Sequence, residues 1–281
     1  MAQLVEHHLA KVRVAGSNPV VRSIVKAGRL GVRLLLAGAS ILVVGGCARS
    51  ADSSDALVVA AASDLRDAFG ELAGELGTTD VGEVTFVFGS SGMLREQILN
   101  GAPYDVYVSA NVGFVDEVIA AGMSVSAQPT IYAIGSLAVV TSGEVELTSI
   151  AAVVTDARRI VIAQPKHAPY GVAAREALQT LGLWDTVESR IVYADNVADA
   201  VRIVQSGEVD AGIVARSLVI NDPHLVVDSS LHEPLRQAAV VLRGPRESRA
   251  RAFVDALRTD TVRALMVRYG FDTDVAASGE E

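Results

Sequence analysis

The chain has almost no cysteine and few aromatic side chains. Its 281 residues include one cysteine and one tryptophan, and aromatic residues make up only 5%. A single cysteine excludes intramolecular disulfides and metal sites built from several thiolates. Because aromatic residues are scarce, alanine, valine and leucine must form the core, and the length allows one large or two medium-sized domains.

Basic residues are scarce outside the N-terminal segment. Residues 1–46 contain six Lys or Arg and one acidic residue, Glu6, so the rest of the chain has 18 basic and 32 acidic residues and a net charge of −14. A protein with this negative charge repels nucleic acid at long range, and the sequence has no run of basic residues interleaved with aromatic residues. We therefore expect no nucleic-acid partner, and an anionic ligand must be held by local dipoles.

The motifs of common enzyme classes are also missing. The chain has no Gly-x-Ser-x-Gly elbow, P-loop, His-Glu-x-x-His or Gly-x-Gly-x-x-Gly sequence. His167 lies in a proline-rich loop, where we expect a packing role rather than metal binding. Asp64, Asp67 and Glu71 are interpreted as a solvated helix face and not as an acid/base pair. The sequence thus predicts a protein that is not an enzyme and has no cofactor.

Apolar strands alternate with amphipathic helices along the chain. The continuous apolar run Leu57–Ala62 is typical of a strand buried on both faces, and the helix after it ends at Gly77. This strand-then-helix unit recurs, and a second series begins at Leu137. The predicted strands are Leu57–Ala62, Phe86–Phe88, Val106–Ser109, Leu137–Thr141, Arg159–Ala163, Ile191–Ala194, Ala211–Val214, Val226–Val227 and Ala238–Leu242. The alternation predicts two mostly parallel α/β halves with a ligand cleft at the carboxyl ends of the strands.

Four of the strand-to-helix junctions have the composition of an anion site. In the clearest, Phe86–Leu94, two β-forming residues lead into Gly-Ser-Ser-Gly and a helix follows at once. Such a junction gathers unpaired backbone N–H groups and serine hydroxyls at one point, which suits an anion. The others are Ser63-Asp64, the loop at 164–171 and Asp195-Asn196. A single junction is equally explained by a simple helix cap, so the repetition carries the hypothesis.

The N-terminal segment has the layout of an export signal. Four basic residues precede the apolar run Leu34–Val44, which is too short for an ordinary membrane span. The sequence Val44–Cys47 resembles the lipobox of a bacterial lipoprotein signal peptide; the alternative for Cys47 is a buried core residue. The resemblance implies a signal peptide at 1–46, a lipidated tether at 47–55 and a cell-membrane anchor at Cys47. Residues 1–20 are unusual for a signal peptide, and we interpret them as a start site placed too far upstream.

Eight short motifs occur in the order and spacing of the molybdate-binding proteins of ABC importers. They are Ala60–Leu65, Phe88–Gly92, Asn100–Ala110, Pro165–Gly171, Leu181–Trp184, Asn196-Val197, Asp210–Val214 and Arg268–Phe271. The resemblance covers roughly residues 57–271. It implies an α/β class II periplasmic-binding-protein fold, with two lobes, two hinge crossovers and a ligand cleft. The implied division is lobe I at 56–133 plus 238–273 and lobe II at 134–237.

The resemblance also implies the ligand contacts. Ser63 and Ser91 would bind molybdate from lobe I, and the backbone N–H groups of Tyr170 and Val197 would bind it from lobe II. Ser90 is a further candidate that would share the anion. Molybdenum would be present only as the oxyanion, with no other metal.

One position departs from the family pattern. The family often has a tyrosine hydroxyl after Gly-Ile-Val, but this chain has Ala215 followed by Arg216. A lost hydrogen bond to a charged ligand costs about 1.5–3 kcal/mol unless another donor replaces it. The Tyr170 phenol, Arg216 or a water is the expected replacement.

The implied function is capture of molybdate by a monomeric extracytoplasmic lipoprotein that delivers it to an ABC permease and its ATPase. Molybdate is a tetrahedral dianion that only accepts hydrogen bonds, so a site made of donors fits it, and tungstate, of nearly the same size, should bind too. Hydrogen phosphate must also donate a hydrogen bond and would meet no acceptor in such a site. Sulfate is smaller than molybdate, so the size of the pocket must exclude it. The alternatives are a receptor for sulfate or phosphate, or a signalling lipoprotein on the same fold.

Overall fold

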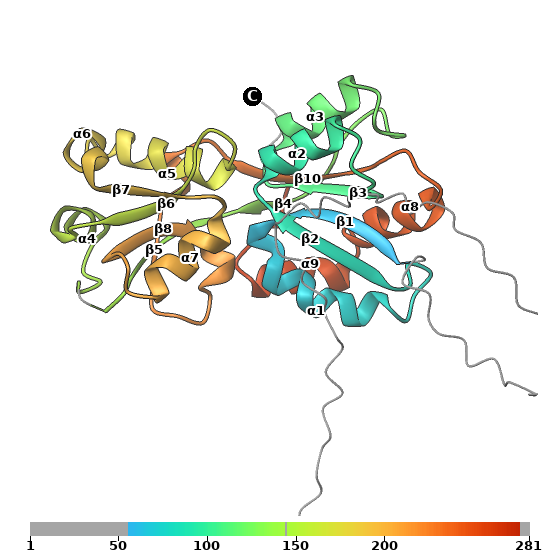
Figure 1. The fold of residues 1–281 in the computed structure, drawn as a ribbon. Coiled ribbons are helices and arrows are strands. Elements are labelled where there is room, and N and C mark those ends of the chain that lie inside the picture. The colour runs from blue at the N-terminus through green and yellow to red at the C-terminus, as the bar shows by residue number, and fades with distance from the viewer. Residues whose placement is uncertain (1–55, 144, 276–281) are drawn as a thin grey trace, which may run out of the picture.

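The chain forms two α/β lobes that lie side by side (Figure 1). The computed structural model describes residues 56–143 and 145–275. The expected signal peptide at 1–46, the tether at 47–55 and the lipidation site Cys47 lie outside the described residues. None of the helices in the described ranges has the length and apolar character needed to cross a membrane.

Lobe I is built on a five-stranded sheet with the order β2-β1-β3-β10-β4. Strand β1 pairs in parallel with β2 and β3, whereas β10 is antiparallel to both β3 and β4. The strands are β1 (Leu57–Ala62), β2 (Val84–Gly89), β3 (Val106–Ser109), β4 (Thr130–Gly135) and β10 (Leu235–Val241). The helices are η1 (Ser63–Leu65), α1 (Arg66–Leu76), α2 (Ser91–Leu99), α3 (Val112–Ala120), α8 (Glu247–Ala256) and α9 (Asp260–Arg268).

Lobe II repeats this plan with the strand order β7-β6-β8-β5-β9. Strand β6 is parallel to β7 and β8, and β5 is antiparallel to β8 and β9. The strands are β5 (Leu137–Thr141), β6 (Ile160–Ala163), β7 (Ile191–Ala194), β8 (Ala211–Ala215) and β9 (Leu225–Val226). The helices are α4 (Ile150–Asp156), α5 (Pro169–Thr180), α6 (Trp184–Val187), η2 (Glu188–Arg190), α7 (Val197–Gln205), η3 (Arg216–Leu218) and η4 (Ser229–Leu231).

The pairing differs from the sequence-based expectation in two ways. The sheets are mixed rather than mostly parallel, because β10 and β5 enter them in the antiparallel direction. Strand β4 was not among the predicted strands, although Ile131–Ile134 is an apolar run. The antiparallel strands are those beside the hinge, where the chain passes from one lobe to the other.

The hinge is short and made of strands. Only Ser136 separates β4 in lobe I from β5 in lobe II, and Gly135 at the end of β4 pairs with Leu235 at the start of β10. The expected boundaries at 133/134 and 237/238 fall inside β4 and β10. A bulge separates Gln237 from Ala238 at the second of these points.

Three phenylalanine side chains pack together in the core of lobe I. Phe69 of α1, Phe86 of β2 and Phe253 of α8 are each at most 3% exposed. Their ring centroids lie 5.3 to 6.1 Å apart. Such aromatic pairs contribute about 0.5–1.5 kcal/mol each beyond the burial of their area. Elsewhere alanine, valine and leucine fill both cores, as the composition predicts.

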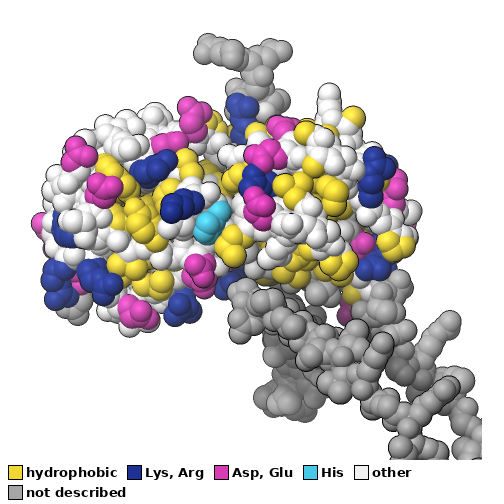
Figure 2. Space-filling model, turned by 45° about the horizontal axis from the view of Figure 1, so that its top comes forward, with side chains coloured by type: hydrophobic (Ala, Val, Ile, Leu, Met, Phe, Trp, Pro, Cys, Tyr) yellow, Lys and Arg dark blue, Asp and Glu magenta, His cyan; other side chains and the backbone are white. Residues whose placement is uncertain are grey.

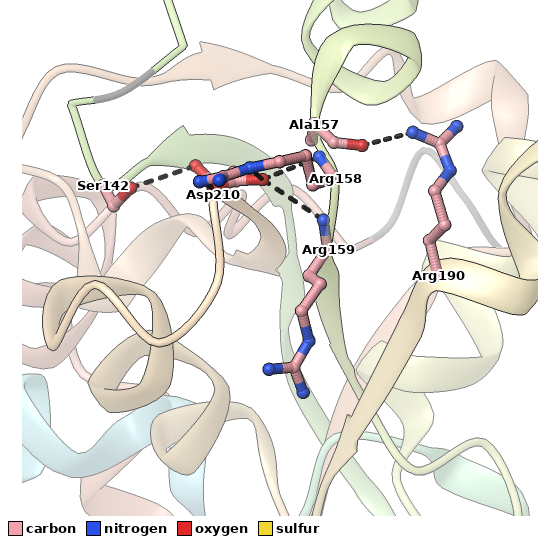
Figure 3. Close-up of polar contacts among 6 residues, drawn as sticks. All are labelled: Ser142, Ala157, Arg158, Arg159, Arg190 and Asp210. Carbon is pink, nitrogen blue, oxygen red and sulfur yellow. Dashed lines mark hydrogen bonds and ion pairs between the residues drawn. The ribbon is translucent and has the colours of Figure 1, made fainter.

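Asp210 fixes the start of strand β8 in lobe II (Figure 3). Its carboxylate accepts hydrogen bonds from the backbone N–H of Arg158 at 2.6 Å and from the Arg158 guanidinium at 2.7 Å. The N–H of Arg159 contributes a third contact at 3.3 Å. Arg158 beside the carboxyl group lowers the pKa of Asp210 to about 2. This motif residue therefore has a structural role and lies outside the cavity described below.

We expect Asp210→Asn to lower the free energy of unfolding by about 2 kcal/mol at pH 7, because it removes charge-assisted hydrogen bonds. The contribution of the carboxylate is present above the ordinary pKa of an aspartate and is lost as the pH falls toward 2, since the pKa in the folded protein is lowered. The difference from wild type should therefore shrink between pH 4 and pH 2 in urea titrations. Asp156→Asn, at an exposed position on α4, is the control. An equal loss in both variants would contradict this role.

Candidate functional site

A small cavity lies where the two lobes meet. Its volume is about 10 Å³. That is room for a single small ion or water-sized group. Its wall is formed by Ala62, Ser63, Asp64, Gly89, Ser90, Ser91, Ala110, Ala168, Pro169, Tyr170 and Val197. The structure thus brings together the four residues expected from the sequence, Ser63, Ser91, Tyr170 and Val197, and the further candidate Ser90.

Both serine side chains are held so that their protons remain available. Ser91 Oγ accepts a hydrogen bond from Ala110 N–H at 3.0 Å, and Ser63 Oγ accepts a longer one from Ala198 N–H at 3.4 Å. Because each oxygen is the acceptor in these contacts, each hydroxyl proton is free to be donated to a third group. The Tyr107 phenol donates to the Ser91 carbonyl at 2.7 Å and fixes the first turn of α2.

Two backbone donors come from the first turns of helices in lobe II. Tyr170 is the second residue of α5, and Val197 is the first residue of α7. The N–H groups of Tyr170 and Val197 have no acceptor among the described residues. The side chain of Asn196 caps the next two N–H groups of α7 and leaves that of Val197 unpaired. Helix N-termini carry about half a positive charge, so these N–H groups suit an anion.

No cation lines this cavity within the described ranges: its wall contains neither lysine nor arginine. The described part of the chain includes no group of three or more histidine, cysteine or acidic side chains able to hold a metal ion. On the face shown in Figure 2, basic and acidic side chains are interspersed over both lobes and form no continuous basic surface. The donors of the site are therefore uncharged hydroxyl and backbone N–H groups, and the one ionisable side chain in the wall is Asp64.

His167 joins the lobes across the cavity. Its carbonyl oxygen accepts a hydrogen bond from Gly92 N–H at 2.9 Å, and its Nδ1 lies 2.8 Å from Ser90 Oγ. Partial burial lowers the pKa of His167. The sequence predicts only a packing role for this residue, and no motif points to its contact with α2. These contacts show that the lobes are closed.

The burial of Asp64 differs from the sequence-based expectation. It is 1% exposed rather than part of a solvated helix face. Its Oδ2 accepts hydrogen bonds from the Tyr170 phenol at 3.0 Å and from Gln237 Nε2 at 2.8 Å. Burial raises the pKa of Asp64 to about 7. The neighbouring Asp67 is exposed, as expected.

The expected replacements for the missing tyrosine hydroxyl lie elsewhere. The Tyr170 phenol donates its hydrogen bond to Asp64. Ala215 is fully buried at the end of β8 and does not line the cavity. Arg216 begins η3, which carries its side chain to a separate hollow beside Gly270. The structure therefore does not place Ala215 or Arg216 with the other candidates.

The family model described as bacterial extracellular solute-binding protein matches residues 57–272. The chain belongs to this family. Solute-binding proteins bind their ligands without transforming them, which agrees with the expectation that the chain is not an enzyme. It also places the chain among proteins that act outside the cytoplasm.

Several relatives of this solute-binding protein are similar over most of their length. The molybdate-binding protein ModA of Rhodobacter capsulatus is 33% identical over 250 residues, which are 85% of this chain and 97% of that protein. A Bacillus subtilis protein named as an ABC transporter substrate-binding lipoprotein is 27% identical over 84% of this chain and 96% of its own length.

Solved structures confirm the two-lobed fold of this solute-binding protein. The periplasmic molybdate-binding protein of Azotobacter vinelandii has a TM-score of 0.72 and 29% identity, covering 76% of this chain and 98% of that chain. The sulfate-binding protein SubI of Mycobacterium tuberculosis has a TM-score of 0.67 and 13% identity, covering 79% of this chain and 88% of its own. The second likeness shows the fold alone.

Proposed function

We propose that the protein captures molybdate, and also tungstate, and delivers it to the permease and ATPase of an ABC importer. The observation that carries this proposal is the cavity itself. Two serine hydroxyls and two unpaired helix N–H groups line it, and no lysine or arginine does among the described residues. The names of the relatives from Rhodobacter and Azotobacter support the choice of ligand.

The donor set fits a fully deprotonated tetrahedral dianion. Such an ion has oxygens that only accept hydrogen bonds, and the closed lobes keep water out, which strengthens each bond. Neutral donors also avoid the desolvation of a buried counter-ion. The net charge of −14 beyond residue 46 gives no long-range attraction for an anion, so binding must come from these local dipoles.

Anchoring and delivery complete the proposal. A signal peptide at 1–46 would direct export, and lipidation of Cys47 with the tether at 47–55 would hold a monomeric receptor at the cell membrane. The lobe boundaries at 133/134 and 237/238 would divide the molecule into the parts that close on the ion. The permease would recognise the closed form, since the ligand stabilises that arrangement.

Calorimetric titration of the purified mature protein with four oxyanions tests this function. We expect tight binding of molybdate and tungstate, with dissociation constants within about tenfold of each other, or about 1.4 kcal/mol. Sulfate should bind at least about 100-fold more weakly because it is too small to reach donors on both lobes. Hydrogen phosphate should not bind. Preference for sulfate or phosphate would replace the proposal with the corresponding receptor, and absence of binding to all four would refute it.

A further inference from the structure

A buried carboxyl group forms part of the cavity wall. Asp64 directly follows Ser63 and lines the cavity. Its hydrogen bonds reach Tyr170 in α5 of lobe II and Gln237 in β10 beside the hinge. Its backbone carbonyl accepts a further hydrogen bond, at 2.7 Å, from the hydroxyl of Ser217 in η3. Asp64 therefore lies at the junction of both lobes and the hinge, next to the proposed anion.

This carboxyl group is incompletely satisfied. Three buried polar atoms in its surroundings have no partner in the described part of the chain: Asp64 Oδ1, the Tyr132 hydroxyl oxygen and Gln237 Oε1. An ionised carboxylate offers only acceptors, whereas the protonated acid also offers a donor. Protonation would therefore supply a donor beside two oxygens that lack a partner, Gln237 Oε1 and the Tyr132 hydroxyl oxygen.

The groups that face Asp64 provide no compensating charge. The facing titratable groups are the phenols of Tyr170 and Tyr132, and burial raises the pKa of each well above its ordinary value, so both are neutral. Gln237 and Ser217 are uncharged. No ion pair joins Asp64 to a cation within 56–143 and 145–275.

No charged side chain of the adjoining elements contributes to the shift in the pKa of Asp64. On α1, Arg66 interacts with the exposed Asp67. Arg216 of η3 lines the separate hollow beside Gly270. On α7, Asp199 forms an ion pair with an arginine of its own helix. An ionised Asp64 would thus be an isolated buried charge beside a bound dianion.

We propose that Asp64 takes up a proton when the oxyanion binds beside it, so that ligand capture at this site is linked to proton uptake. This inference rests on the proposed function. Two negative groups in a closed cavity with little water repel each other strongly, because the effective dielectric constant there is low. Protonation of Asp64 removes the repulsion and leaves both hydrogen bonds to its carboxyl group possible.

The sign of the pH dependence follows from linkage. Burial raises the pKa of Asp64 to about 7 without ligand, and a neighbouring dianion raises it further. Below pH 7 the group is already protonated, so the dissociation constant should be independent of pH. Above pH 7 binding must take up a proton, and the dissociation constant should increase by up to about tenfold per pH unit.

The experiment is calorimetric titration with molybdate between pH 6 and pH 9, in buffers of different ionisation heat. For wild type we expect uptake of up to one proton on binding and a dissociation constant that increases above pH 7. Asp64→Asn carries a neutral group of similar size, so its dissociation constant should be flat between pH 6 and pH 9 and its binding should take up no proton. A wild-type pH dependence of the dissociation constant in this variant, or proton uptake on binding, would overturn the inference.

Two further variants separate this effect from other causes. Tyr170→Phe removes a hydrogen bond that favours the ionised carboxylate, so the pH at which affinity begins to fall should move upward. This shift gives an answer even if Asp64→Asn does not fold, and an unchanged midpoint would count against the proposal. In His167→Gln the dissociation constant should still increase above pH 7. If it no longer increased, the pH dependence would be due to the histidine.

The possible outcomes distinguish proton linkage at Asp64 from the proposed oxyanion-binding function. Wild-type protein that binds molybdate equally well from pH 6 to pH 9 would refute proton linkage and leave the oxyanion receptor intact. Protein that binds no molybdate at any pH would refute the receptor itself. Phosphate binding that is abolished by Asp64→Asn would show the carboxylate acting as an acceptor for a protonated anion, contrary to both proposals.

Discussion

Replacing Ser63 and Ser91 together by alanine is expected to weaken molybdate binding by about 10²- to 10⁴-fold. Each serine oxygen already accepts a hydrogen bond from a backbone N–H, so its own proton is left for the ligand. A hydrogen bond to a charged partner contributes about 1.5–3 kcal/mol, and two such losses give the stated range. The measurement is calorimetric titration near pH 7.

The matched control for the serine pair is Ser109→Ala. Ser109 is also fully buried, and its hydroxyl bonds the backbone of Asn111, but it does not line the cavity. Its loss should lower the melting temperature and leave the dissociation constant unchanged. The serine contacts would be disproved by a double variant that remains folded and binds molybdate as wild type does.

The second large effect is expected for Gly92→Ala, which should weaken molybdate binding by about 10- to 100-fold by obstructing closure. A Cβ atom at residue 92 would lie 2.7 Å from the carbonyl oxygen and 2.9 Å from the Cα atom of His167 in the opposite lobe. These are backbone atoms that do not move as a flexible side chain does. Overpacking of this kind costs about 1–3 kcal/mol.

The same substitution should not destabilise the open, ligand-free protein. Gly92 lies in the first turn of α2, and alanine favours a helix over glycine by up to about 1 kcal/mol. Affinity and ligand-free stability should therefore change in opposite directions. Gly74→Ala in α1, where a Cβ atom meets nothing within 4 Å, is the control and should leave the affinity unchanged. Small-angle scattering should show ligand-induced compaction in the control and wild type but not in Gly92→Ala; compaction in all three would contradict the model of closure.

The positions of Ser63, Ser91, Tyr170 and Val197 could be predicted because they depend on local structure. A strand that ends in small or polar residues before a helix determines where the first N–H groups of that helix lie. Parallel strands then bring the junctions of one sheet to one edge. For these residues the pattern and the family resemblance indicate the same places, and the cavity contains all four.

Asp64 and His167 could not be understood from nearby residues. The partners of Asp64 are 106 and 173 positions away in the chain, and Gly92 is 75 positions from His167. Beside Asp67 and Glu71, an aspartate at 64 has the spacing of a solvated helix face. Its burial depends on a 3-10 turn, η1, that precedes α1 and turns the carboxyl group inward. Gln237 reaches Asp64 through the folding of lobe I, and Tyr170 reaches it from lobe II.

The single residue between β4 and β5 limits how the receptor can move. Ser136 alone connects β4 to β5, and β10 is paired with β4 as far as Gly135, so the lobes are joined next to a paired strand end rather than by a loose linker. A connection this short limits how far the lobes can move apart. The relative orientation of the lobes would then indicate to any partner whether the site is filled.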